Sequence, residues 1–130
     1  MIKVHVKKQS NYPVKSTRIK QSLKEFLKEK GIVTDSEVSV ALVGKEKAVF
    51  LAREYLKERP ARAHNVLSFS AAETKGKFIE PPAKRIYLGE IVVCFPIALS
   101  EARKEGKLTD EKVIELVEHG ALHLLGIHHK

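Results

Sequence analysis

The sequence predicts an α+β fold in which a small mixed β-sheet of about four strands packs against several helices. Three observations lead to this prediction. Apolar and polar residues alternate with the period of a strand at the start of the chain, whereas four other segments carry apolar residues at helical spacing. Two consecutive strand-like segments interrupt the strand–helix alternation, so the expected order is βαβαββαα. The chain has 130 residues, which suits a single domain over residues 1–130.

The first half of the chain alternates strands and helices. Residues 2–7 alternate apolar and polar side chains and predict a strand with one solvated face. Ser16 is the expected N-cap of a helix over residues 17–30, whose apolar residues form one stripe. Residues 38–43 predict a second strand, and residues 45–57 predict a helix that a proline three residues later stops.

The second half supplies two more strands and two more helices. Residues 65–69 predict a short strand, and residues 86–94 predict a strongly apolar one. The segment 71–83 between them contains glycine and prolines, so we expect a mobile loop there. A proline in the first turn starts a helix over residues 96–104, and Thr109 is the expected N-cap of the last helix.

The charge of the chain is unevenly distributed. The net charge is +8, and residues 1–65 hold 15 basic and 7 acidic residues, whereas residues 66–130 hold 9 of each. A localised basic surface favours a polyanionic partner such as RNA, because binding releases condensed counterions. The alternatives are that the charge serves solubility alone, or thermal adaptation through many Lys/Glu pairs.

No segment is suited to crossing a membrane or to forming an intrachain disulfide. The longest apolar run, residues 91–99, has nine residues and contains Pro96, whereas a membrane span needs about 20. The N-terminus lacks an apolar core as long as that of a signal peptide. Cys94 is the only cysteine, and its apolar strand predicts a buried thiol. We therefore expect a soluble, cytoplasmic protein without a membrane partner.

The strongest chemical signal is a cluster of histidines near the end of the chain. His119 and His123 are four residues apart on a predicted helix, so both imidazoles lie on one face and suit a single divalent metal. Gly126 can end the helix and let the chain return a third imidazole. His128 and His129 compete for that place, and we choose His129. Three histidines leave one tetrahedral position open for water, as in catalytic zinc sites.

The same spacing occurs in the metzincin proteases, whose pattern is H-E-x-x-H-x-x-G-x-x-H. Gly120 stands where the protease has its glutamate base, and the sole methionine is Met1, so no Met-turn follows. A peptidase-like metallohydrolase would therefore need a base from elsewhere, for which Glu90 is a candidate if it lies beside the metal. A third hypothesis is a non-catalytic ribosome-binding protein with structural zinc. Ser68 lacks the G-x-S-x-G turn of a serine nucleophile.

Three segments carry a resemblance to a known family. Residues 119–129 match the motif H-G-x-L-H-L-x-G-x-D-H, except that His128 replaces the aspartate. Residues 65–69, with the sequence Asn-Val-Leu-Ser-Phe, and residues 88–94 look like two further motifs in the same order. On these residues, the chain resembles the YbeY family of single-strand-specific metallo-endoribonucleases over nearly its whole length.

The resemblance implies an α+β fold with one Zn²⁺ per chain, bound by His119, His123 and His129. It also implies cleavage of single-stranded RNA rather than DNA, processing of the 3′ end of small-subunit rRNA, and ribosome quality control. The expected partners are rRNA and the small ribosomal subunit. At position 128, the change from aspartate to His128 removes a carboxylate that could orient a ligand histidine.

The family also has a functional arginine shortly before the second motif, usually next to the aromatic residue that ends the second helix. In this chain, Leu56 follows Tyr55, and the loop is about two residues longer than the pattern. Arg59 and Arg62 are the candidates for that role. We expect one of these guanidinium groups to clamp a phosphate near the zinc.

Overall fold

The computed structural model describes residues 1–71 and 86–126. It confirms the α+β class and the predicted order βαβαββαα. Most of the segment 71–83, expected to be a mobile loop, lies outside the described residues, as do His128 and His129. The elements are β1 (Ile2–Lys8), α1 (Ser16–Glu29), β2 (Ser36–Val43), α2 (Lys45–Tyr55), β3 (Val66–Ser70), β4 (Ile86–Cys94), α3 (Phe95–Glu105) and α4 (Thr109–Leu124).

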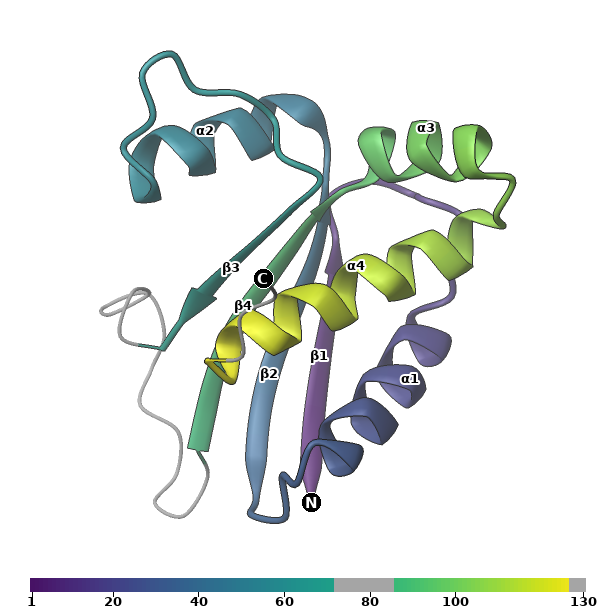
Figure 1. The fold of residues 1–130 in the computed structure, drawn as a ribbon, viewed down its shortest axis with the longest axis vertical. Helices are drawn as coiled ribbons and strands as arrows, with labels where there is room; N and C mark the ends of the chain where they lie inside the picture. The colour runs from purple at the N-terminus through teal and green to yellow at the C-terminus, as the bar shows by residue number, and fades with distance from the viewer. Residues whose placement is uncertain (72–85, 127–130) are drawn as a thin grey trace.

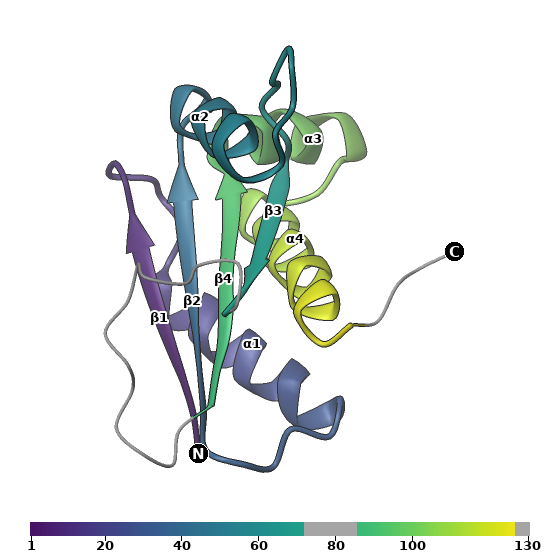
Figure 2. The ribbon, with the colours of Figure 1, turned by 90° about the vertical axis from the view of Figure 1, so that its left-hand side faces the viewer.

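The four strands form one mixed sheet in the order β1-β2-β4-β3 (Figure 1). Strands β1, β2 and β4 run parallel to one another, whereas β3 runs antiparallel to β4 and forms an edge of the sheet. Figure 2 shows α1 and α4 side by side on one face of the sheet, with α2 near the top of the other face. No helix of the described part is long and apolar enough to cross a membrane.

Two apolar clusters fill the two faces. The larger lies between the sheet and the helix pair α1 and α4, and Ile91 of β4 belongs to it. The smaller lies under α2, and Val92, the next residue of β4, belongs to that one. Because successive side chains of a strand point to opposite faces, each residue of β4 serves one cluster only. The smaller cluster consists of Val43, Ala48, Leu51, Leu67, Phe69, Val92 and Cys94.

Two predicted N-caps were wrong by one residue. Helix α1 begins at Ser16 itself, after an extended Lys15, and makes no side-chain cap hydrogen bond. Helix α4 begins at Thr109 after Leu108. There the Glu111 carboxylate accepts a hydrogen bond from the Leu108 backbone N–H at 3.0 Å, so a downstream glutamate supports the helix start instead of a threonine hydroxyl.

A buried lysine joins α3 to α4. The Lys112 residue is 5% exposed, and its Nζ donates to Glu105 at 3.0 Å and to Glu115 at 2.8 Å. Burial acts to lower the pKa of Lys112, but hydrogen bonds to the two carboxylates raise it above its usual value. Hydrogen bonds from Lys107 and Lys112 lower the pKa of Glu115 in turn. These charges compensate one another at the helix–helix contact.

We expect this network to make stability depend on acidic pH. Because the pKa of Glu115 is lowered on folding, its contribution is complete above the unfolded pKa and is lost as the pH falls through the folded pKa. Lys112→Met keeps the aliphatic stem and removes the charge. The wild type should therefore lose more stability than this variant between about pH 5 and pH 3, measured by urea unfolding at fixed pH. Lys104→Met, an exposed change on α3, is the control and should keep the wild-type slope. Equal slopes for Lys112→Met and wild type would contradict the prediction.

Candidate functional site

The two helical histidines lie together on the exposed side of α4. The ring centroids of His119 and His123 are 4.9 Å apart, with 59° between the ring planes. The spacing of four residues predicts this arrangement, because it returns a side chain to the same face one turn later. Gly126 follows with a left-handed backbone, at φ 76°, and its N–H donates to the His123 carbonyl oxygen at 3.0 Å. The helix therefore ends directly after the pair.

A glycine between the two histidines sets how close α4 lies to the sheet. A Cβ atom on Gly120 would stand 2.7 Å from Ile91 Cγ2 and 3.4 Å from Val66 Cγ2. A Cβ atom at 2.7 Å would force a neighbour to shift, so the helix backbone packs closely against side chains of β3 and β4. In the sequence, Gly120 stands in place of the protease glutamate and is the second residue of the motif matched over residues 119–129. Its packing role was missed, although a buried glycine in the middle of a helix is a sign of close approach.

The close approach places the histidines on the wall of a cavity of about 260 Å³. Helix α4 forms one wall, β3 forms another, and Leu56 closes the end near α2. The predicted motif at 65–69 and the histidine motif thus meet in one place, although about 50 residues separate them in the sequence. The lining residues are Leu56, Asn65, Val66, Leu67, Ser68, His119, Gly120 and His123.

Asn65 is held in this cavity by a residue from a third element. Its Nδ2 atom donates to both carboxylate oxygens of Glu101 on α3, at 3.2 and 3.3 Å. The same carboxylate lies 3.6 Å from Lys112 Nζ. Asn65 was predicted only as part of a strand motif. Its partner Glu101 carries no sequence signal, because the contact depends on where α3 lies relative to the residue that precedes β3.

The two predicted arginines lie in the loop after α2. Arg59 and Arg62 are exposed, and neither is among the residues that line the cavity. The Arg62 backbone N–H donates to Glu58 Oε1 at 3.3 Å, and the other Glu58 oxygen lies 2.6 Å from His64 Nε2. Desolvation raises the pKa of Glu58, but the hydrogen bonds from His64 and Arg62 bring it below its usual value. The phosphate-clamping role of either arginine stays a prediction.

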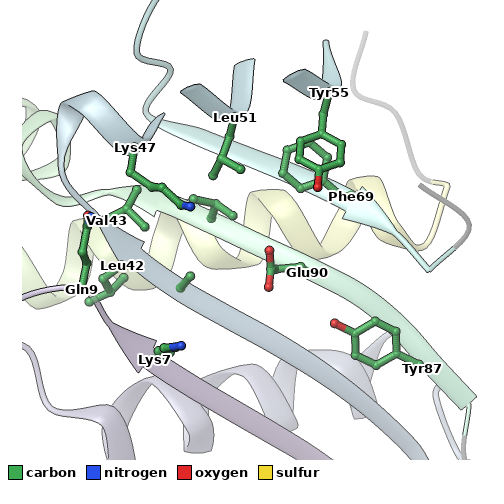
Figure 3. A pocket seen from close by; sticks show the side chains of 12 residues that line it. Lys7, Gln9, Leu42, Val43, Lys47, Leu51, Tyr55, Phe69, Tyr87 and Glu90 are labelled. Carbon is green, nitrogen blue, oxygen red and sulfur yellow. The ribbon is translucent and has the colours of Figure 1, made fainter. Parts of the chain in front are cut away.

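Glu90 lies on the other face of the sheet. It lines a larger cavity of about 630 Å³ under α2, together with Lys7, Lys47 and Tyr87 (Figure 3). Its neighbour Ile91 points toward α4, so strand alternation directs the Glu90 carboxylate away from the histidine pair. A peptidase-like mechanism that takes its base from Glu90 therefore does not fit this geometry.

The donors at the histidine site fit a divalent transition metal. Two imidazoles one turn apart on the exposed side of a helix are the chelating pair of many zinc sites. Within residues 1–71 and 86–126, no three His, Cys, Asp or Glu side chains come close enough to hold a metal. His129 lies outside the described residues, so its role as third ligand stays a prediction. Cys94 is buried, as predicted, and desolvation by burial raises its pKa, which disfavours the thiolate.

Comparisons with known proteins agree with this geometry. The family model described as Endoribonuclease YbeY matches residues 3–130. The protein named Endoribonuclease YbeY of Stutzerimonas stutzeri is 39% identical over 95 residues, which are 73% of this chain and 55% of that protein. The protein of the same name from Acinetobacter baylyi is 31% identical over 123 residues, 95% of this chain and 75% of the relative. This chain thus spans just over half of the Stutzerimonas protein.

A solved structure is similar over almost the whole chain. The solution structure of a Thermotoga maritima protein matches with a TM-score of 0.57 and 27% sequence identity. The match covers 98% of this chain and 75% of that one. The fold described above is therefore shared with a structure solved by experiment.

The Gly120 contact gives a direct test of the packing that builds the site. Gly120→Ala should destabilise the protein by about 1–3 kcal/mol, because overpacking against Ile91 outweighs the gain of about 1 kcal/mol in helix propensity. In an Ile91→Ala background, the same change should cost much less. Urea unfolding of the four proteins in this double-mutant cycle measures the difference. An equal cost in both backgrounds would contradict the packing described here.

Proposed function

Because the chain belongs to the YbeY endoribonuclease family, we propose that it is a metal-dependent endoribonuclease that cleaves single-stranded RNA. The observation that carries the proposal is the pairing of His119 and His123 on the wall of a cavity lined by the second family motif. The excess of basic residues in positions 1–65 supports a polyanionic substrate.

In this proposal, His119, His123 and His129 hold one Zn²⁺. When bound, the ion would supply Lewis-acid stabilisation of the phosphoryl oxygen and a nucleophile at neutral pH. Each imidazole would bind the ion through an unprotonated ring nitrogen. Residues of β3 close one side of the cavity and limit the space around the reacting phosphate.

The substrate and its setting follow from the same surfaces. A cavity of about 260 Å³ between a helix and an edge strand suits a single extended strand better than a rigid duplex. The chain has 3 Tyr, 5 Phe and no Trp, so it offers few aromatic platforms for stacking bases. We therefore propose that the small ribosomal subunit presents the 3′ end of its rRNA to this cavity, in rRNA processing and in ribosome quality control.

The metal site can be tested with one histidine. His123→Ala should bind no stoichiometric zinc and should lose cleavage of a labelled single-stranded RNA, because one imidazole of the helical pair is missing. His5→Ala is the matched control, since His5 is an exposed histidine on β1 whose side chain pairs with Glu37. Metal analysis and gel electrophoresis of the RNA products measure both properties. Full metal content together with full cleavage in His123→Ala would overturn the proposal.

The predicted phosphate contact of Arg59 or Arg62 can be tested by the kinetics of RNA cleavage. If Arg59 or Arg62 holds a phosphate, its replacement by alanine should lower kcat/KM about 10- to 100-fold, the usual range for a hydrogen bond to a charged group. Metal content and unfolding midpoint should stay unchanged. Arg53→Ala, at another exposed arginine on α2, is the control. If both loop variants cleave RNA at the wild-type rate, neither arginine clamps the substrate.

A further inference from the structure

The edge strand β3 offers hydrogen-bonding groups beside the histidine pair. Among the strands of the described chain, β3 pairs with β4 alone, so its other side forms the edge of the sheet. Val66 and Ser68 of this strand line the same cavity as His119 and His123. The question is which polar groups of β3 face that cavity.

The register of the antiparallel pair answers this for the backbone. The Cys94 N–H donates to the Asn65 carbonyl oxygen at 2.9 Å, and the pairing continues with Val66 opposite Val93. In an antiparallel ladder, only alternate residues exchange hydrogen bonds with the partner strand. Residues 65, 67 and 69 therefore bond toward β4. Val66 and Ser68 direct their N–H and C=O groups to the outer edge.

The side chains of β3 point alternately to the two faces of the sheet. Leu67 and Phe69 enter the apolar cluster under α2. Val66 lies toward α4, where its Cγ2 atom is 3.4 Å from a Cβ placed on Gly120. Ser68 is two residues further along and shares the face of Val66. Its hydroxyl thus lies on the same side of the sheet as the histidines, and its backbone N–H points to the edge that no other strand of the described residues pairs with.

We propose that Ser68 is a substrate-binding residue that donates two hydrogen bonds, from its backbone N–H and from its hydroxyl, to the phosphate of the bound RNA strand. Two adjacent donors beside metal-binding imidazoles suit an anion, and a phosphate contact carries no base sequence, so every nucleotide meets it equally. This inference rests on the proposed function and adds a residue to that site. Ser68 acts here by binding the phosphate, and no covalent step passes through its hydroxyl.

Proline provides the sharpest variant. Ser68→Pro removes both donors at once, and an outward-facing position on an edge strand tolerates the loss of its N–H. Ser68→Ala removes only the hydroxyl. Ser68→Thr keeps both donors and is the conservative variant. Ser10→Ala is the control for the loss of a serine hydroxyl, because Ser10 is exposed, lies outside β3 and is not among the residues lining the cavity.

Binding is measured first with metal-free protein, by fluorescence anisotropy of a labelled single-stranded RNA, and cleavage is measured next with zinc-loaded protein. Ser68→Ala should weaken RNA binding about tenfold and Ser68→Pro about a hundredfold, with zinc content unchanged. The RNA affinities of Ser68→Thr and Ser10→Ala should stay within about threefold of the wild-type value. A methylphosphonate in place of the contacted phosphate should weaken binding to wild type more than binding to Ser68→Ala.

The outcomes separate the two proposals. If the wild type neither binds nor cleaves single-stranded RNA, the proposed function fails and this inference fails with it. If the wild type does both and Ser68→Ala and Ser68→Pro behave like it, the role of Ser68 alone is overturned. If circular dichroism shows that Ser68→Pro does not fold, Ser68→Ala and the methylphosphonate comparison decide. If the methylphosphonate weakened RNA binding equally in wild type and in Ser68→Ala, the inference would then be overturned.

Discussion

The site depends on the close contact that Gly120, which has no side chain, allows between α4 and the sheet. A Cβ atom there would stand too close to the Ile91 side chain without a shift, so glycine lets the helix backbone pack closely against the side chains of β3 and β4. This distance brings the imidazoles of His119 and His123 level with the edge strand. A larger residue at position 120 would leave the spacing of the two histidines along the helix intact, but it would move them away from β3.

Alternation along β4 divides the chemistry of the molecule between two faces. Ile91 supports α4 and the histidine cavity, whereas Glu90 and Val92 face the cavity under α2. A shift of β4 by a single residue would exchange these roles and bring the Glu90 carboxylate to the side of the histidine pair. The histidine pair and the Glu90 carboxylate thus lie on opposite faces of the sheet because of the register of β4.

The sequence predicted the elements and their order well, because periodicity and helix-ending glycines are local signals. It also placed His119 and His123 on one face, since this needs only the pitch of a helix. It could not predict on which side of the sheet Glu90 lies, because that depends on strand order. The hydrogen bond from Asn65 to Glu101 could not be predicted either, because it depends on how the helices pack. Both N-cap errors came from weighing hydroxyl residues above their neighbours.

Glu101 links parts of the molecule that otherwise have separate tasks. Its carboxylate accepts two hydrogen bonds from the Asn65 amide at the cavity and also lies near the buried Lys112 ammonium between α3 and α4. The Glu101 side chain therefore serves both the cavity and the contact between the two helices. A change that removed the Glu101 carboxylate would therefore disturb the charge balance between these helices and leave the Asn65 amide at the cavity without this partner.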